Sequence, residues 1–178
     1  MDEITLINGC VKGDAKAQRM LFDRFAPKML AVCMRYTSDQ MEAEDILQEG
    51  FIKIFNKLSD FKMDGSLEGW IRRIMVNTSI DNIRKNKRIK EEANIDDVGY
   101  KISDEMLPSD DIMAADLMKL IMEMPEGYKV VFNLFAIEGY SHKEIAETLN
   151  ISENTSKSQY SRARAYLRTQ LEQLKIER

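Results

Sequence analysis

Apolar residues recur at intervals of three and four along most of this 178-residue chain, and this spacing constrains the fold more than any other feature. It is the spacing of the buried face of an α-helix, and no convincing strand-like alternation interrupts it. The chain holds only three prolines and eight glycines, so few positions oppose helix formation. The sequence therefore predicts an all-α protein.

The helical spacing falls into two blocks. In the first, the apolar pattern runs from Thr5 to Phe25 and continues beyond Pro27 to Tyr36. Asp39 and Glu42 form a capping pair before a helix that reaches about residue 58, and Ser66 caps a helix that runs toward residue 90. In the second block, we expect helices over residues 111–124, 125–138, 141–149 and 153–175.

Between the blocks the helical spacing fades and acidic residues accumulate. From Glu91 to Asp116 there are nine acids against one base, Lys101, and Gly99 and Pro108 interrupt any helix. We therefore expect two small helical domains, at 1–90 and 111–178, joined by a flexible acidic linker at 91–110.

The net charge of −4 hides two basic stretches. Seven basic residues against one acid lie between Arg72 and Lys90, and four basic residues with no acid lie between Lys157 and Arg168. Clustered basic charge in each block indicates two nucleic-acid surfaces.

Several classes of protein are excluded. No apolar run is long enough to span a membrane and no secretory signal opens the chain, so we expect no membrane insertion and a cytoplasmic protein. Cys10 and Cys33 are expected to be small buried hydrophobes, and the lone His142 a surface residue. No phosphate-binding glycine loop, metal-ligand cluster or nucleophile with a histidine partner occurs, so we expect no catalytic residues, no metal and no cofactor.

The second block contains a helix-turn-helix pattern. Ser141 and Glu144 form a capping box, Asn150 and Ile151 make a tight turn, and Ser152 caps a longer helix. On that helix an apolar stripe faces inward: Tyr160, Ala163, Leu167, Leu171 and Leu174.

The opposite side of this longer helix carries groups suited to DNA. The residue types that reach base edges are Thr155, Ser158, Gln159 and Arg162, and those placed for phosphates are Lys157 and Arg164. A helix-turn-helix alone does not separate a polymerase subunit from a dimeric transcription regulator that binds palindromic operators without polymerase, and that alternative stays open here.

The helix expected over residues 39–58 has a second unusual face. Its inward stripe is Leu47, Phe51, Ile54, Phe55 and Leu58, and the residues opposite are Asp45, Gln48, Glu49 and Ile52. An exposed isoleucine ringed by carboxylates and an amide is suited to protein docking, although a solvated acidic face has the same composition.

Three stretches resemble the sigma-70 family. The segment A-E-D-I-L-Q-E-G-F at 43–51 resembles region 2.2, the segment at 61–88 that includes G-S-L-E-G-W-I-R-R-I resembles regions 2.3 and 2.4, and S-E-N-T-S-K-S-Q-Y-S-R-A-R at 152–164 resembles region 4.2. With no region 3 between them, the resemblance points to the extracytoplasmic-function (ECF) group.

This resemblance implies a function and partners. The chain would bind bacterial core RNA polymerase, through the β′ clamp and the β flap, and direct it to promoter DNA; an anti-sigma factor would restrain it. The resemblance implies that Asp45, Gln48 and Glu49 contact polymerase, with the exposed Ile52 expected beside them, and that the helix-turn-helix residues above read the −35 element. For the −10 element it implies Lys62, Met63, Asp64, Ser66, Arg73, Asn77, Asp81, Arg84, Lys85, Lys87 and Arg88.

The chain departs from the family pattern at two places. Ser156 stands where the family often has valine, on the buried side of its helix, and Gln159 stands where many members carry arginine. The base preference of better-known members is therefore not transferred to this chain.

Overall fold

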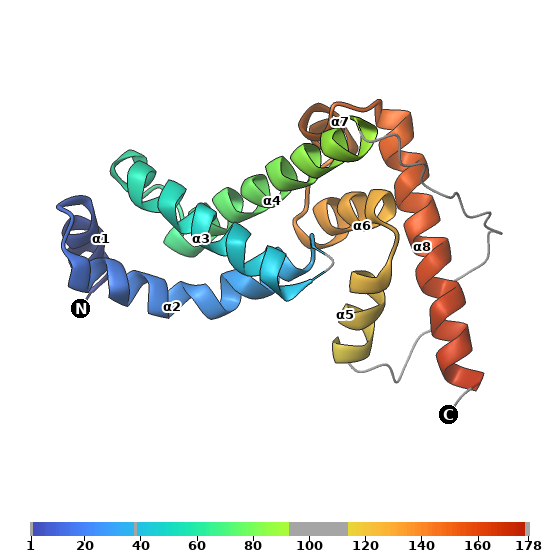
Figure 1. Cartoon of the computed structure of the whole chain (residues 1–178), viewed down its shortest axis with the longest axis horizontal. Coiled ribbons are helices and arrows are strands. Elements are labelled where there is room, and N and C mark those ends of the chain that lie inside the picture. Colours follow the sequence, from blue (N-terminus) through green and yellow to red (C-terminus); the bar gives the residue numbers. More distant parts are fainter. Residues whose placement is uncertain (1, 38, 93–113, 177–178) are drawn as a thin grey trace. The chain divides into compact units, whose positions relative to one another are not determined.

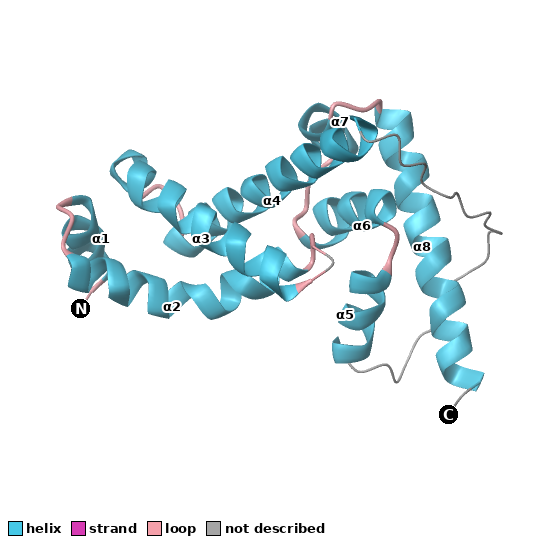
Figure 2. Cartoon of the chain, in the orientation of Figure 1, coloured by secondary structure: helices cyan, strands magenta, loops and turns pink. Residues whose placement is uncertain are grey.

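The structure is a computed structural model that describes residues 2–37, 39–92 and 114–176, and every regular element in these ranges is a helix (Figure 2). The prediction of an all-α chain is confirmed. The chain divides into two compact units, residues 1–92 and 93–178. Most of the expected linker at 91–110 lies outside the described residues.

The first unit is a bundle built around three long helices (Figure 1). Its elements are α1 (Glu3–Val11), α2 (Ala15–Met34), α3 (Gln40–Lys57), the 3₁₀ turn η1 (Leu58–Asp60) and α4 (Leu67–Glu92). Helices α2, α3 and α4 pack against one another, and α1 packs on α2. The most deeply buried side chains of this unit include Leu21, Met29, Ile46, Ile54, Ile71 and Met75.

Local caps explain where α3 and α4 begin. The Asp39 carboxylate accepts a hydrogen bond from the Glu42 backbone N–H at 2.9 Å, and the Ser66 hydroxyl accepts one from the Gly69 N–H at 3.0 Å. Each bond satisfies a backbone donor that has no partner within the helix. Both predicted caps are confirmed.

The first helical segment is broken where its apolar pattern gives no sign of a break. Gly13 adopts a φ of +77° between α1 and α2, and Asp14 caps α2 by accepting from the Lys16 N–H at 2.9 Å. Cys10 and Ala17 are both buried, so the apolar spacing continues across the turn. Pro27, by contrast, lies inside α2 and does not end it.

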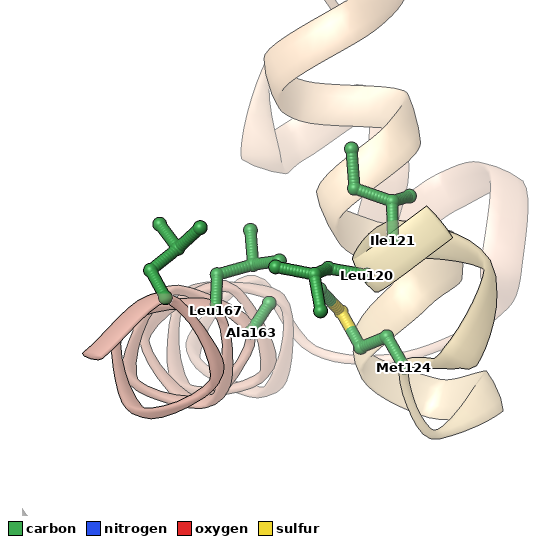
Figure 3. Packing of buried hydrophobic residues seen from close by; sticks show 6 residues of the cluster. Leu120, Ile121, Met124, Ala163 and Leu167 are labelled. Atoms are coloured by element: carbon green, nitrogen blue, oxygen red, sulfur yellow. The ribbon is translucent and has the colours of Figure 1, made fainter. Parts of the chain in front are cut away.

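In the second unit, shorter helices pack around one long helix. Its elements are α5 (Ala114–Glu123), α6 (Glu126–Phe132), the π-helical turn η2 (Asn133–Ile137), α7 (His142–Leu149) and α8 (Glu153–Ile176). Figure 3 shows Leu120 and Met124, at and just beyond the end of α5, facing Ala163 and Leu167 of α8, and Ile121 belongs to the same buried cluster. The predicted apolar stripe of α8 is confirmed, with Ala163, Leu167 and Leu171 buried and Tyr160 and Leu174 half-buried.

Helices α7 and α8 form the predicted helix-turn-helix. The Ser141 hydroxyl accepts from the Glu144 N–H at 3.2 Å, and the Glu144 carboxylate accepts from the Ser141 N–H at 2.8 Å, which completes the capping box. Asn150 ends α7 in the left-handed region, at a φ of +55°. The Ser152 hydroxyl then accepts from the Thr155 N–H at 2.9 Å at the start of α8.

Candidate docking and nucleic-acid surfaces

The outer side of α3 presents the predicted protein-docking residues. Asp45, Gln48, Glu49 and Ile52 are all exposed, and Ile52 keeps 61% of its surface accessible. On the inner side Leu47, Phe51 and Ile54 are buried, with Phe51 packed on Phe22 at a ring-centroid distance of 4.6 Å. Because the apolar side of α3 packs into the core, the side that carries the predicted docking residues faces outward.

Met41 belongs to the same exposed surface and is absent from the predicted set. It is 78% exposed and lies one turn before Asp45. The spacing of four, three and four from Met41 through Asp45 and Gln48 to Ile52 makes one stripe, with its two apolar ends about 16 Å apart at 1.5 Å per residue. We name Met41, Asp45, Gln48, Glu49 and Ile52 the docking face. Helical spacing extended one turn back could have found Met41.

A hollow of about 510 Å³ lies beside the docking face. It is lined by Asp39, Gln40, Met41, Glu42, Asp45, Asn82 and Asn86. Within it, the Glu42 carboxylate accepts hydrogen bonds from the amides of Asn82, at 2.6 Å, and Asn86, at 2.7 Å. These two bonds hold the start of α3 against the second half of α4.

The loop between η1 and α4 has an exposed polar surface and one unusual residue. Lys62, Met63, Asp64 and Ser66 are exposed. Met63 has a φ of +56°, a backbone conformation that non-glycine residues rarely adopt, and its side chain remains 48% exposed. Such strain tends to persist where a function uses it.

Helix α4 presents most of the remaining −10 candidates on its surface. Arg73, Asn77, Asp81, Arg84 and Lys85 are exposed. Lys87 and Arg88 lie in α4, but their side chains are outside the described part of the structure. Trp70 is half-buried against Phe61, with ring centroids 5.5 Å apart, so this indole has a packing role.

A chain of ion pairs connects α3 to α4. Lys53 Nζ lies 2.8 Å from Glu49 Oε1 and 3.6 Å from Asp81 Oδ2. The other oxygen of Asp81, Oδ1, lies 3.6 Å from Arg84 Nη1. One docking-face carboxylate and one α4 carboxylate therefore share a single lysine.

The outer side of α8 carries the −35 candidates in differing degrees of exposure. Ser158 and Arg162 are exposed, as are Lys157 and Arg164 on the flank. The Arg164 guanidinium lies 5.9 Å from the centroid of the Tyr160 ring, within cation–π distance. Thr155 is half-buried and shares a hydrogen bond of 2.8 Å with the Ser152 hydroxyl.

Gln159 does not lie fully on this open side. It is half-buried, and its Oε1 is buried without a hydrogen-bond partner in the structure. Both terminal atoms of its amide lie 3.9 Å from the position that a Cβ on Gly127 would occupy. The α8 wheel does not predict this burial, because it depends on the approach of α6.

The prediction that His142 is a surface residue is correct only in part, because one side of the residue is packed. Its ring is half-buried and stacks on Phe135 with centroids 4.3 Å apart and planes 14° apart. His142 Nδ1 lies 2.9 Å from the hydroxyl oxygen of Ser156, which is fully buried. This contact satisfies a polar group at the core-facing position where the sequence departs from valine.

Two features are absent from the part of the chain that the structure describes. No helix there is both long enough and apolar enough to cross a bilayer. No group of three or more histidine, cysteine, aspartate or glutamate side chains there is arranged to hold a metal ion.

Comparison with known proteins covers both units. Residues 21–89 match the family described as Sigma-70 region 2, and residues 114–167 match Sigma-70, region 4. The chain is 32% identical over 174 residues to the ECF RNA polymerase sigma factor SigW of Bacillus subtilis, across 92% of this chain and 93% of that protein. It is 27% identical over 180 residues to the ECF RNA polymerase sigma-E factor of Haemophilus influenzae, across 95% of each.

A solved structure supports the same fold. The sigma factor RpoE, in its complex with the anti-sigma factor NepR from Bartonella quintana, superposes with a TM-score of 0.53. The match covers 90% of this chain and 98% of that one, at 22% sequence identity.

Proposed function

The chain belongs to the sigma-70 family of RNA polymerase sigma factors, in its ECF group, and from this premise we propose the surfaces through which it acts. As a sigma factor it binds core polymerase and directs promoter-specific initiation. We propose that the docking face binds the β′ clamp, that the 61–66 loop and α4 engage the −10 element, and that α8 reads the −35 element.

The observation that carries the polymerase assignment is the composition of the docking face. Met41 and Ile52 are large apolar side chains that the fold leaves 78% and 61% exposed, and between them lie Asp45, Gln48 and Glu49. Apolar contacts surrounded by charge are typical of protein interfaces. The partner surface would be apolar at two points and basic between them.

A charge-reversal experiment tests this assignment. Asp45→Lys combined with Glu49→Lys should weaken core binding by tenfold or more, since each substitution places like charges together across the interface. The matched control is Glu3→Lys with Asp23→Lys, which reverses two exposed carboxylates on α1 and α2. Fluorescence anisotropy with purified core polymerase measures both variants. Equal affinities of the two variants would refute the docking assignment.

The −10 assignment rests on the loop and on the charge of α4. Met63 offers an exposed apolar side chain from a strained backbone, a suitable surface for an unstacked base. Extracting a base costs a few kcal/mol, and nearby cations that contact phosphates offset part of this cost. The exposed Lys62, Arg73 and Lys85 supply such charges. Lys87 and Arg88 remain candidates by resemblance.

The −35 assignment separates base reading from phosphate binding. We expect the exposed Arg162 and Ser158 to contact base edges, and Lys157 and Arg164, which flank them, to contact phosphates. Thr155 and Gln159 would contribute from the edge of the surface.

Paired substitutions in α8 distinguish these roles. Arg162→Ala should cost about 1–3 kcal/mol on the preferred −35 duplex and less on a scrambled one. Lys157→Ala should weaken binding to both duplexes alike and lower the salt slope by about 1. If Arg162→Ala weakened both duplexes equally, its assignment to base reading would be wrong.

The dimeric helix-turn-helix regulator that the sequence leaves open is not favoured, because the family matches include region 2 as well as region 4.

We further propose that α5–α8 bind the β flap, that residues 91–110 act as the linker between the two domains, and that the chain acts in the cytoplasm without catalytic activity. Since the structural relative RpoE is solved with an anti-sigma factor, we propose that a partner of this kind restrains the present chain.

A further inference from the structure

Lys53 is placed between the two surfaces proposed for the first unit. It belongs to neither, yet its ammonium group lies 2.8 Å from Glu49 of the docking face and 3.6 Å from Asp81 on α4. Its side chain is 34% exposed, less than the 57% of either carboxylate. Lys53 is therefore the most enclosed member of the ion-pair chain.

An aspartate within a DNA-binding surface needs a physical explanation. Asp81 would repel the phosphates that α4 is proposed to bind, and it lies 3.6 Å from Arg84, one of the cations that would attract them. Lys53 counters this repulsion only in part, because the Glu49 carboxylate lies closer to it than the Asp81 carboxylate does. In the free chain Asp81 therefore shares Lys53 with Glu49 and also holds the Arg84 guanidinium by a second ion pair.

We propose that Lys53 is a positioning residue that couples polymerase docking to DNA binding, an inference that rests on the function proposed above. When a basic group of polymerase pairs with Glu49, Lys53 loses its closer partner and pairs with Asp81 alone. Asp81 then releases Arg84 toward the phosphates. Because coupling between two binding events is reciprocal, −10 DNA should strengthen polymerase binding by the same factor.

The expected size of this coupling is modest. Exposed ion pairs contribute a few tenths to about 1 kcal/mol, which corresponds to an affinity change of about 2- to 5-fold. The effect should shrink at high salt, because exposed charges are screened.

Removing the Glu49 charge imitates docking without polymerase. Glu49→Gln should raise the affinity of the full-length chain for a fluorescent single-stranded −10 oligonucleotide by about 2- to 5-fold at low salt. The same substitution in a Lys53→Met background should give no such gain, whereas a Lys53→Arg background should preserve it. Asp45→Asn removes one charge elsewhere on the docking face. It should change the affinity for the oligonucleotide by the same factor in the wild-type and Lys53→Met backgrounds.

The outcomes separate the coupling from the function beneath it. A gain from Glu49→Gln that persists in Lys53→Met, or no gain in the wild-type background, would overturn the coupling alone. If the wild-type chain failed to bind the oligonucleotide at every salt concentration tested, the assignment of α4 to DNA binding would be wrong, and the coupling would be wrong with it. Urea unfolding followed by Trp70 fluorescence checks that each variant is folded.

Discussion

Gly50 offers a quantitative test of the packing between α3 and α4. A Cβ at this position of α3 would lie 2.8 Å from Met75 Cε on α4 and closer still to Met75 Sδ. Normal contacts between such atoms are about 3.5–4 Å. Met75 is flexible but fully buried, so its displaced end must move into filled space.

The expected effect of Gly50→Ala follows from two opposed terms. Alanine stabilises a helix interior by about 1 kcal/mol relative to glycine. Overpacking a core costs about 1–3 kcal/mol. We therefore expect the free energy of unfolding of the first unit to fall by up to about 2 kcal/mol. In a Met75→Ala background the clash is absent, and the same substitution should stabilise.

The single tryptophan makes the measurement specific to one unit. Trp70 lies in α4 and packs on Phe61, so its fluorescence reports on the first unit even when the second unfolds separately. Urea titrations of the four variants in the Gly50–Met75 cycle give the coupling energy. Gly65→Ala is the matched control, because a Cβ there meets nothing within 4 Å, and it should be neutral or stabilising by up to about 1 kcal/mol.

A Gly50→Ala effect that is the same in both backgrounds would contradict the predicted clash. A coupling below about 0.5 kcal/mol would mean that α3 and α4 approach each other less closely at this point than the structure indicates.

Three further predictions concern other parts of the chain. Ser141→Ala should destabilise α7 by about 1 kcal/mol, seen as faster amide exchange, because the capping box is lost. Burial raises the pKa of the Cys33 thiol to about 11 from an ordinary 9. The buried neutral thiol therefore contributes fully to the free energy of unfolding below pH 9, and this contribution is lost as the pH rises toward 11. Cys33→Ala should abolish this loss, which urea titrations at several pH values measure. Ser156→Val should leave His142 Nδ1 without its partner and weaken −35 duplex binding several-fold in anisotropy, and an unchanged affinity would mean that this contact does not position α8.

Much of the fold could be predicted because its signals are local. Asp39, Ser66 and Ser141 each cap a helix within three residues of themselves, and the apolar spacing of α3 and α8 identifies their inward faces. The break at Gly13 was missed because apolar residues lie at helical spacing on both sides of it, although Gly13 followed by Asp14 is itself a helix stop and a helix cap. A positive φ at one glycine leaves no periodic signal.

The parts of the candidate site that escaped prediction depend on tertiary contacts. Lys53 and Asp81 are 28 residues apart, and a wheel of either helix alone cannot bring them together. The burial of Gln159 depends on the approach of α6 to α8. The role of His142 depends on Phe135, which the π-helical turn η2 presents to it. Met41 differs, since the spacing of α3 alone was sufficient to find it.

The contact between His142 and Ser156 has a consequence for engineering promoter preference. If an α8 taken from a relative carried valine at the position of Ser156, the imidazole on α7 would face a methyl group. A graft confined to α8 would therefore leave His142 of α7 without its polar partner. Chimeras of this factor should therefore exchange α7 and α8 together as one cassette.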